Sequence, residues 1–455
     1  MAIVSTLFYF IITIGILVLV HESGHFLAAI ACGMRAEVFA LGMGNRVFGW
    51  NKVNKFTFGS LKDDLDLQGN TDYRVAAFPI GGYVKIAGMI DESMDTEFLN
   101  KEPQPWEFRS KPIWQRMIVI SAGVIMNLIL AVFIFWGILF QQGKMIRPVT
   151  EIGYVTSNSV AAKAGMQSGD KILSINNHPM KQWDEIESTL ITESVTNTND
   201  VTIQVQRSGA VRTLSIRRSE MPDFTKEGFG MFPAGMVPVV ELVERGKPAE
   251  QIGLQPGDTL LAVNELSVSF GSLQEAIRLH AGKEILLSWA RGNQKMSAHV
   301  VPTAEGRIGV SLNGAYHGPI IHKQYSMFEA LPIGVGELKT TSVLILTNLY
   351  QIVTGKVSLG KSVGGPVKIA QMAKRSAEDG VLEFFGFISI LSISLALLNI
   401  LPFPALDGGH LVFLVYEAVF KREVPAKIKI ALQQAGFILL LVFMAFVLYN
   451  DVVNF

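Results

Sequence analysis

Four long stretches without a charged residue constrain this chain more than any other feature. They cover residues 2–20, 117–143, 384–406 and 430–450 of a sequence of 455 residues. Each is close to or above the roughly 20 residues that a helix needs to cross a bilayer. Charged residues make up only 17% of the chain, against roughly 25% in an average soluble domain. The sequence therefore predicts a multi-pass α-helical membrane protein with four spans.

Composition excludes several other classes. The first stretch has no basic residues before it, and a His/Glu cluster interrupts it where a signal peptide would have a cleavage site, so we expect a retained span. Basic and acidic residues balance at 39 each, which gives no indication of a nucleic-acid partner. The single Cys32 excludes an intrachain disulfide framework.

Basic residues predict the orientation in the membrane. Nine lysines and arginines lie between residues 35 and 110, and four lie between residues 421 and 429. The positive-inside rule assigns both loops to the cytoplasm. We therefore expect both termini, and the long segment 145–380, on the external side.

A repeat occurs within that external segment. The thirteen residues from Gly165 to Asn177 recur 88 positions later, from Gly253 to Glu265, with six identical positions. Each copy contains a Gly-Asp turn followed by an apolar strand pattern. Two copies are too few for a solenoid, so two sibling domains are the better interpretation.

The candidate chemistry lies at the end of the first span. His21-Glu22-Ser23-Gly24-His25 matches H-E-x-x-H, in which two histidines at i and i+4 share one helix face and can bind one metal ion. Glu22 is then placed to accept a proton from an attacking water. A polar group inside a spanning helix costs free energy in the membrane, so such groups usually serve a function. The alternative is a polar helix end at the membrane interface.

A catalytic zinc site generally uses three protein ligands, so a third is expected elsewhere. The third span ends in Asn399-Ile-Leu-Pro-Phe-Pro-Ala-Leu-Asp407-Gly-Gly-His410, where prolines and glycines break the helix. Broken backbone at membrane depth is tolerated where protein or a cavity covers it. We predict Asp407 as the third ligand, with His410 as the chemically reasonable rival.

These motifs together resemble the site-2 protease family of intramembrane zinc metalloproteases, in particular its Gram-negative double-PDZ branch. The resemblance covers essentially the whole chain. It implies one Zn²⁺ per chain held by His21, His25 and Asp407, with Glu22 as the catalytic base. It also implies that Asn399 helps to hold the substrate backbone. The family's usual second asparagine, five residues earlier, is Ser394 here, so that role is not carried over.

Two further family elements are weaker. Gly123-Val-Ile-Met-Asn127 matches a G-x-x-x-N motif, for which close helix packing through Gly123 is the favoured interpretation. The family also has a membrane-reentrant β-structure that presents substrate, and Gly81, Gly82, Tyr83 and Val84 are the candidate substrate-binding residues here. From the residues alone, a plain cytosolic hairpin would fit equally well.

Each copy of the repeat resembles a PDZ domain. The peptide-binding loops would lie at Phe229-Gly230 and Ile308-Gly309, after the Gly-Asp core, which implies the circularly permuted form. Such a loop offers backbone N–H groups to a peptide carboxylate. Folded β-rich α/β domains that bind no terminus are the alternative.

The expected organisation follows from these assignments. It comprises a first span (1–34), a cytoplasmic-side loop with membrane-associated β-structure (35–111), a second span (112–144), two PDZ domains (149–236 and 237–312), a linker with an interfacial amphipathic helix (313–380), a third span (381–410), a cytoplasmic loop (411–429) and a fourth span (430–450). The uncharged stretch 340–355 is too short for a span and is expected at the interface.

The leading hypothesis is an intramembrane zinc endopeptidase of a bacterial inner membrane, in contact with membrane lipids. The resemblance implies a single-span substrate already cut once outside, such as an anti-sigma factor in envelope-stress signalling, or leftover signal peptides. A membrane-tethered PDZ scaffold with an inactive metal site is the second possibility. A transporter is the third, but it predicts inverted repeats within the membrane, and the only repeat found lies outside it.

Overall fold

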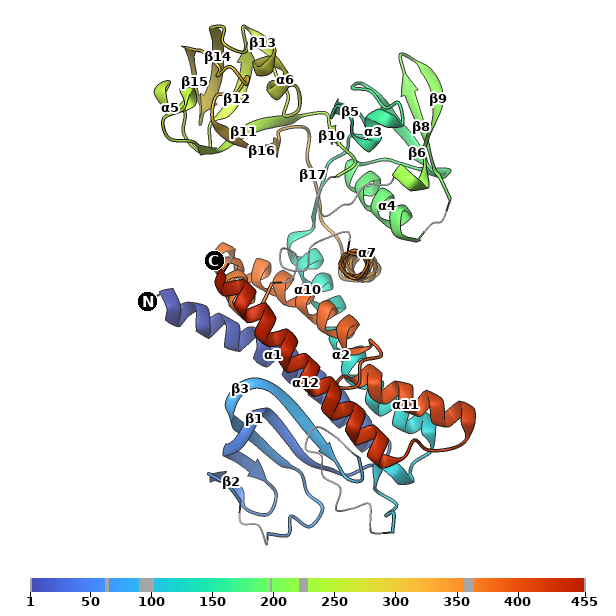
Figure 1. Ribbon diagram of the computed structural model, residues 1–455. Helices are drawn as coiled ribbons and strands as arrows, with labels where there is room; N and C mark the ends of the chain where they lie inside the picture. The colour runs from blue at the N-terminus through green and yellow to red at the C-terminus, as the bar shows by residue number, and fades with distance from the viewer. Residues whose placement is uncertain are drawn as a thin grey trace. The chain divides into compact units, whose positions relative to one another are not determined.

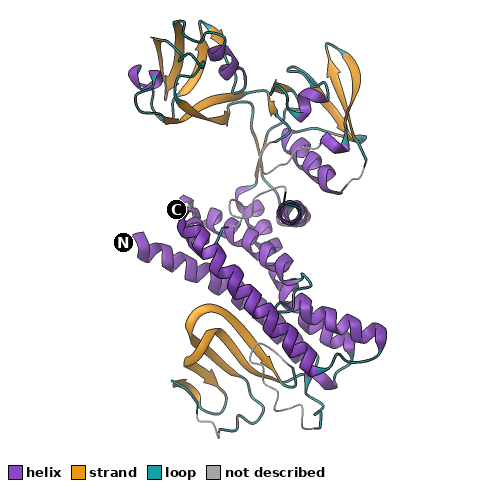
Figure 2. Ribbon diagram, viewed as in Figure 1, coloured by secondary structure: helices purple, strands orange, loops and turns teal. Residues whose placement is uncertain are grey.

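The computed structural model describes residues 2–61, 65–89, 102–196, 199–220, 228–355 and 364–453. The chain forms two compact units, one of Met1–Gln142 with Tyr325–Phe455 and the other of Gly143–Gln324. The first unit contains the long helices and a small sheet, and the second is built mainly from strands (Figures 1 and 2).

Four helices of the first unit cover the four expected spans. They are α1 (Ala2–Ala31), α2 (Ile113–Gln142), α10 (Val381–Asn399) and α12 (Ala426–Val453). Leu17, Ile134 and Ile388 meet in a buried apolar cluster where α1, α2 and α10 pack together. The Tyr9 ring lies 5.7 Å from the Phe384 ring, so the first residues of α1 and α10 are neighbours. These two helices therefore run in parallel.

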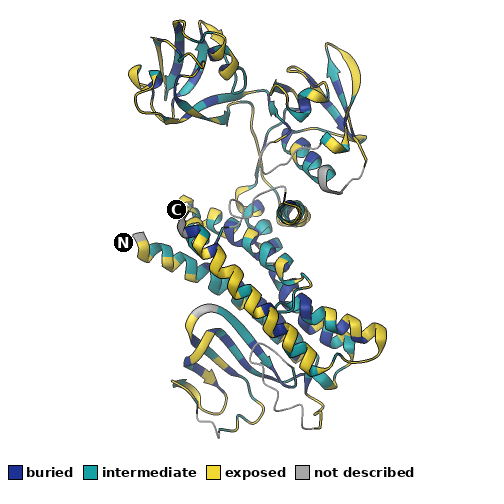
Figure 3. Cartoon of the chain, viewed as in Figure 1, coloured by how far each residue is buried: buried dark blue, intermediate teal, exposed yellow. Residues whose placement is uncertain are grey.

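The outer faces of these helices are apolar and exposed. On α12, for example, Ile438 is 61% exposed and Val442 is 60% exposed. Figure 3 shows exposed residues along much of α12. A large exposed apolar surface is unstable in water and is typical of a protein surrounded by lipid.

A fifth helix was not expected at its observed length. Among the described residues, five helices are long and apolar enough to cross a membrane, and the additional one is α7 (Met327–Val353). Ser326 starts this helix with a capping box to Glu329, well before the uncharged stretch 340–355. The helix is therefore longer than the uncharged stretch, because Glu337 and Lys339 interrupt the apolar run without interrupting the helix, and its expected place at the membrane interface stays a prediction.

The direction of α7 differs from that of the neighbouring helices. Figure 1 looks down the axis of α7, while α2, α10 and α12 run across the page. Gly334 of α7 packs closely on α2, where an added Cβ atom would lie 3.1 Å from the backbone nitrogen of Trp136. The indole of Trp136 donates a hydrogen bond to the Met327 carbonyl at 2.7 Å. Thus α7 crosses α2 instead of running beside it.

Two shorter helices flank the third span. The expected linker contains α9 (Pro366–Asp379), whose first turn is capped by Asp451 of α12 through the backbone amides of Gly365 and Val367. The segment 411–429, predicted as a loop, is helical as far as Phe420 in α11 (Asp407–Phe420). Asp407 is the first residue of this helix, which the sequence pattern did not predict.

The loop after α1 forms an antiparallel sheet of β1 (Ala36–Asn51), β2 (Lys55–Phe58) and β3 (Asp72–Ile86), in the order β2-β1-β3. Both long strands bend. Phe39 of β1 lies opposite Tyr73 on one side and Val84 on the other, so two parts of β3 flank the same part of β1. Among the described strands only β1 pairs with β3, and residues 82–84 therefore lie at an edge of the sheet.

The second unit contains two similar groups of elements, joined to the chain through the paired strands β4 (Lys144–Ile146) and β17 (Ile321–Lys323). The first group consists of β5 (Ile152–Val155), α3 (Val160–Lys163), β6 (Lys171–Ile175), β7 (His178–Pro179), α4 (Trp183–Thr196), β8 (Val201–Arg207), β9 (Ala210–Ile216) and β10 (Met231–Pro233). The second consists of β11 (Met236–Val243), α5 (Pro248–Gln251), β12 (Thr259–Val263), β13 (Leu266–Ser267), α6 (Ser272–Arg278), β14 (Ile285–Arg291), β15 (Gln294–Val300) and β16 (Val310–Tyr316).

The repeated Gly-Asp turns have matching contacts in the two groups. Arg207 donates two hydrogen bonds to Asp170, and Arg291 donates two to Asp258. Burial opposes ionisation of each carboxyl, but the arginine hydrogen bond, a backbone hydrogen bond and the arginine charge together outweigh it and hold the pKa of both below the usual range. The strand β16 continues to Tyr316, beyond residue 312, where the second domain was expected to end.

Candidate metal centre

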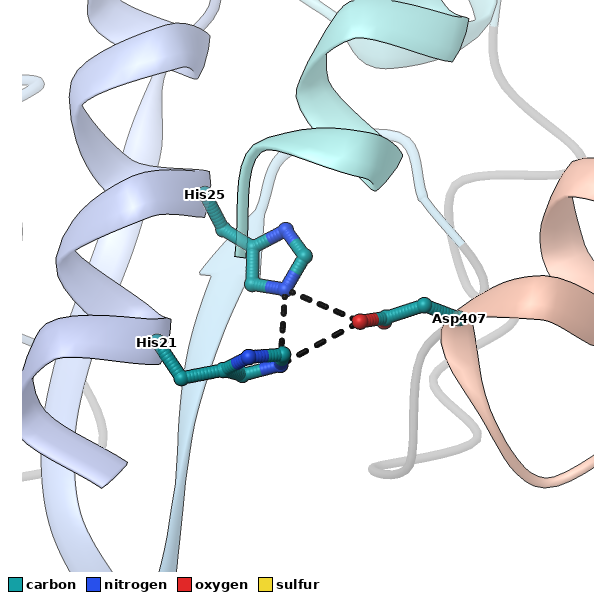
Figure 4. A group of neighbouring side chains, drawn as sticks. All are labelled: His21, His25 and Asp407. Atoms are coloured by element: carbon teal, nitrogen blue, oxygen red, sulfur yellow. Dashed lines mark hydrogen bonds and ion pairs between the residues drawn. The ribbon is translucent and has the colours of Figure 1, made fainter. Parts of the chain in front are cut away.

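The two histidines of the H-E-x-x-H motif lie one turn apart on α1 and point the same way. Their Nε2 atoms are 3.2 Å apart, and both side chains are buried. Asp407 approaches from α11 with Oδ2 at 3.2 Å from His21 Nε2 and 3.5 Å from His25 Nε2. Figure 4 shows these three groups converging from two helices. Among the described residues this is the one group of three or more His, Cys, Asp or Glu side chains with metal-site spacing.

The donor set fits a cation. His25 Nδ1 lies 2.8 Å from the carbonyl of Val119, which can only accept, so Nδ1 carries the ring proton and Nε2 presents a lone pair. The buried Oδ2 of Asp407 accepts no well-aligned hydrogen bond from the described residues, although both Nε2 atoms are near. The lone pairs of His25 Nε2 and Asp407 Oδ2 face one another without a proton between them, and such a pair suits a zinc ion.

Close packing of α1 on α2 makes room for this arrangement. A Cβ atom at Gly123 would lie 2.3 Å from His25 Nε2 and 2.7 Å from His21 Cε1. A Cβ atom at Gly24 would lie 2.4 Å from the Ala122 carbonyl oxygen. Both distances are shorter than any tolerable contact. The close helix packing expected at Gly123 is therefore present, and it also brings α2 against the histidine rings.

The break after the third span positions the acid. Helix α10 ends at Asn399, and α11 starts at Asp407 after a connection containing both prolines of the motif. Asn399 Nδ2 lies 3.3 Å from His21 Nε2, so Asn399 faces the same centre. The hydroxyl of Ser394 instead donates to the Ile390 carbonyl of its own helix.

His410 lies near the centre without joining it. Its Nε2 atom is 2.9 Å from the side-chain amide of Gln433 on α12. It lines a small cavity of about 60 Å³ together with the three candidate ligands and Glu22. A second cavity of about 110 Å³ shares His410, Met89 and Ile120 with the first and continues toward Arg109 and Lys429. Polar groups therefore extend from the centre toward the basic end of α12.

The edge of the small sheet lies beside Glu22. A Cβ atom at Gly82 would lie 2.5 Å from Val18 Cγ1 and 3.2 Å from Glu22 Cγ, so only glycine allows β3 to approach α1 this closely. Val84 lines the same 60 Å³ cavity as the histidines. Gly81 takes a positive φ of 77°, and Tyr83 lies opposite Ala40 of β1.

Two contacts at the centre were not predicted from the sequence, although Asn127 was noted there as part of the G-x-x-x-N motif. Asn127 is fully buried, and its side-chain nitrogen lies 3.2 Å from His21 Nδ1. Arg116 of α2 makes a bidentate ion pair with Glu417 of α11, with N–O distances of 2.5 and 3.1 Å. The polar side chain of Asn127 within an uncharged span was the feature that could have indicated this contact. No local signal links Arg116 to Glu417, which lies 301 residues later.

The four predicted peptide-loop residues occupy matching places in the second unit. The carbonyls of Phe229 and Gly230 accept hydrogen bonds from Ala161 and Thr156. Those of Ile308 and Gly309 accept from Ala249 and Glu244 in the same pattern. Both glycines have positive φ, and a Cβ atom on either would collide with a neighbouring side chain at 2.2 Å. They lie in the second unit, whereas all the candidate ligands lie in the first.

Comparison with known proteins agrees with this geometry. Residues 9–443 match peptidase family M50. The chain is 31% identical over 97% of each chain to the regulator of sigma E protease of Haemophilus influenzae. It is 30% identical to protease RseP of Yersinia pestis over 99% of each chain, and 29% identical to the regulator of sigma-E protease RseP of Escherichia coli over 97%. This chain therefore belongs to peptidase family M50, the site-2 protease family.

Proposed function

We propose that this protein is an intramembrane zinc endopeptidase that cuts the transmembrane segments of single-span proteins. The observation that carries the proposal is the convergence of His21, His25 and Asp407 at the end of apolar helices, with Glu22 in the same cavity. When bound, zinc would supply Lewis-acid activation of water and of the scissile carbonyl. The remaining chemistry belongs to the protein's own groups.

Glu22 would move the protons. Its position next to His21 on α1 places its carboxylate in the cavity that the ligands line, so it can accept a proton from the attacking water. The same group can then return that proton to the amide nitrogen as the peptide bond breaks. Asn399, already facing this centre, would donate a hydrogen bond to the substrate backbone.

The edge strand β3 would hold the unwound substrate segment in an extended conformation. A membrane helix hides its peptide bonds, so cleavage requires local unwinding and new partners for the backbone groups. An extended segment can add to the edge formed by residues 82–84, which lies beside Glu22. The closeness of Gly82 to Glu22 supports a substrate-presenting sheet over a plain cytosolic hairpin, and we propose Gly81, Gly82, Tyr83 and Val84 as substrate-binding residues.

Chain direction supports four spans and not five. Because α1 and α10 run in parallel and both reach the metal centre in their C-terminal halves, the last residue of α2 and the first residue of α10 lie at the opposite end. If α7 crossed the membrane once, α10 would have to start on the side of the metal centre, which contradicts its direction. We assign α7 to the membrane interface, and its being the least apolar of the five long described helices also supports this.

With this topology and the positive-inside rule, we propose that the second unit lies outside and that the metal centre lies toward the cytoplasmic half of a bacterial inner membrane. We assign the two groups of strands to PDZ domains, supported by their matching Asp-Arg pairs and loop hydrogen bonds. One relative is named a regulator of sigma E protease, and we propose a substrate of the anti-sigma-factor type that is first cut outside the membrane, as the family resemblance implies.

The direct test is cleavage by purified protein in which Glu22 is replaced. Glu22→Gln should retain zinc and the fold, while cleavage of a transmembrane test substrate falls by orders of magnitude. Glu284→Gln is the matched control, because Glu284 is 66% exposed and lies in the second unit. Normal cleavage by Glu22→Gln would favour the rival function, a PDZ scaffold with an inactive metal site.

A further inference from the structure

Asn127 is a fully buried amide that neither the sequence motifs nor the proposed ligand set assigns a task. It lies on α2, one turn after Gly123, and its exposed fraction is 0%. Its side-chain nitrogen lies 3.2 Å from His21 Nδ1, while its side-chain oxygen has no hydrogen-bond partner among the described residues. An unpaired buried amide oxygen destabilises the folded protein, so this placement needs a reason.

The proton positions on the two histidines provide one. A neutral imidazole carries one proton, so a ring that offers Nε2 to a metal must hold its proton on Nδ1. His25 meets this condition, because Nδ1 donates to the Val119 carbonyl at 2.8 Å. His21 directs Nε2 to the same centre, and Asn127 is the group within hydrogen-bond distance of its Nδ1. A proton on His21 Nδ1 therefore requires a hydrogen-bond acceptor, and Asn127 is the residue placed to provide it.

The amide can supply that acceptor by turning over. With its nitrogen toward Nδ1, Asn127 donates to the ring, which leaves the ring proton on Nε2 facing Asp407 at 3.2 Å. With its oxygen toward Nδ1, it accepts the ring proton, and Nε2 becomes free to bind zinc. The two amide orientations occupy nearly the same space, so the exchange needs no change in packing.

We propose that Asn127 is a positioning residue that holds the Nδ1–H form of His21 and thereby prepares Nε2 for zinc. The inference rests on the proposed zinc site. The backbone of Asn127 is itself fixed, because its carbonyl accepts a hydrogen bond from the buried Ser392 hydroxyl of α10 at 2.8 Å. Partners of this kind orient ligand rings and typically change metal affinity by about 10- to 100-fold when removed.

The test measures zinc affinity of the full-length protein by competition with a chelator, together with thermal unfolding of the zinc-free protein. Asn127→Leu keeps the volume but removes the acceptor, and it should weaken zinc binding by about 10- to 100-fold. Asn127→Asp restores an acceptor, so it should bind zinc at least tenfold more tightly than Asn127→Leu does. This should hold even if burial of the aspartate charge lowers the unfolding temperature. Ser392→Ala is the control, since it removes the helix-helix hydrogen bond and leaves the amide at the ring.

The outcomes separate the possible roles. If Asn127→Leu binds zinc as tightly as the wild type, or if all three variants weaken zinc binding equally, Asn127 serves only helix packing and the inference is wrong. If Asn127→Leu does not fold, the inference requires Asn127→Asp to bind zinc within tenfold of the wild type, and weaker binding contradicts it. Failure of the wild type itself to bind zinc would overturn the proposed metal centre instead.

Discussion

At the residue scale, the metal centre depends on which side chains can reach one point. His21, His25 and Asp407 bring their ligand atoms within 4.8 Å of one another, although Asp407 is far along the chain. His410 is only three residues further, yet its ring is turned toward Gln433 of α12. The difference arises because Asp407 starts α11, whereas His410 lies almost one turn into it.

This arrangement predicts a definite zinc content. The wild type should hold one zinc per chain, and His21→Ala, His25→Ala or Asp407→Ala should each lose it. His410→Ala should retain it, because that ring does not belong to the ligand group. Metal analysis of the purified variants checks this. Full zinc in Asp407→Ala combined with loss in His410→Ala would transfer the third ligand to His410.

At the scale of elements, the centre is held by contacts between helices. Glycines let α1 and α2 touch, and the buried Arg116–Glu417 pair joins α2 to α11, the helix that begins with Asp407. Breaking a buried ion pair commonly costs about 3–5 kcal/mol, because one charge is left without compensation. The position of Asp407 is therefore fixed by α2 as well as by its own chain.

Gly123→Ala tests the helix contact. The added methyl group would lie 2.3 Å from His25 Nε2, so α2 must move away from the histidines and zinc affinity should fall at least tenfold. Gly137→Ala is the matched control on the same helix, where a Cβ atom meets nothing within 4 Å. Chelator competition on both variants gives the comparison. Equal zinc affinity in the two would show that the predicted contact does not limit the site.

At the scale of the whole molecule, the sequence predicted the long apolar helices and the grouping of His21, His25 and Asp407 better than the connections between the helices. Uncharged runs identify α1, α2, α10 and α12, because lipid tolerates few charges. The same criterion missed the full length of α7, whose Glu337 and Lys339 interrupt the run. It also left α11 as a loop. The Arg116–Glu417 pair and the orientation of Asn127 depend on tertiary packing, which no local pattern encodes.

The second unit should act as a size filter and not as part of the catalytic centre, since none of its described residues belongs to the candidate ligand group. Deleting residues 149–312 should leave zinc binding intact and permit cleavage of substrates with large external domains. The strands β4 and β17 pair with each other, so the chain enters and leaves this unit at neighbouring points and can be rejoined there.

The filter is measured as the ratio of cleavage between matched substrates with long and short external domains. The intact protein should strongly prefer the short substrate, and the deletion should not. Substitutions of Gly230 or Gly309 are unsuitable for this purpose, because any side chain there collides with its neighbours. An unchanged ratio in a stable, zinc-containing deletion would rule out the filter.

The central claim is that peptide hydrolysis occurs within a transmembrane segment at the zinc centre. The most direct measurement is the mass of the products that the purified, zinc-containing protein releases from a single-span substrate with a short external segment. Cleavage should fall within the apolar segment and should be absent with Glu22→Gln under the same conditions. Cleavage only outside the apolar segment, or cleavage of the same bond by Glu22→Gln, would contradict this mechanism.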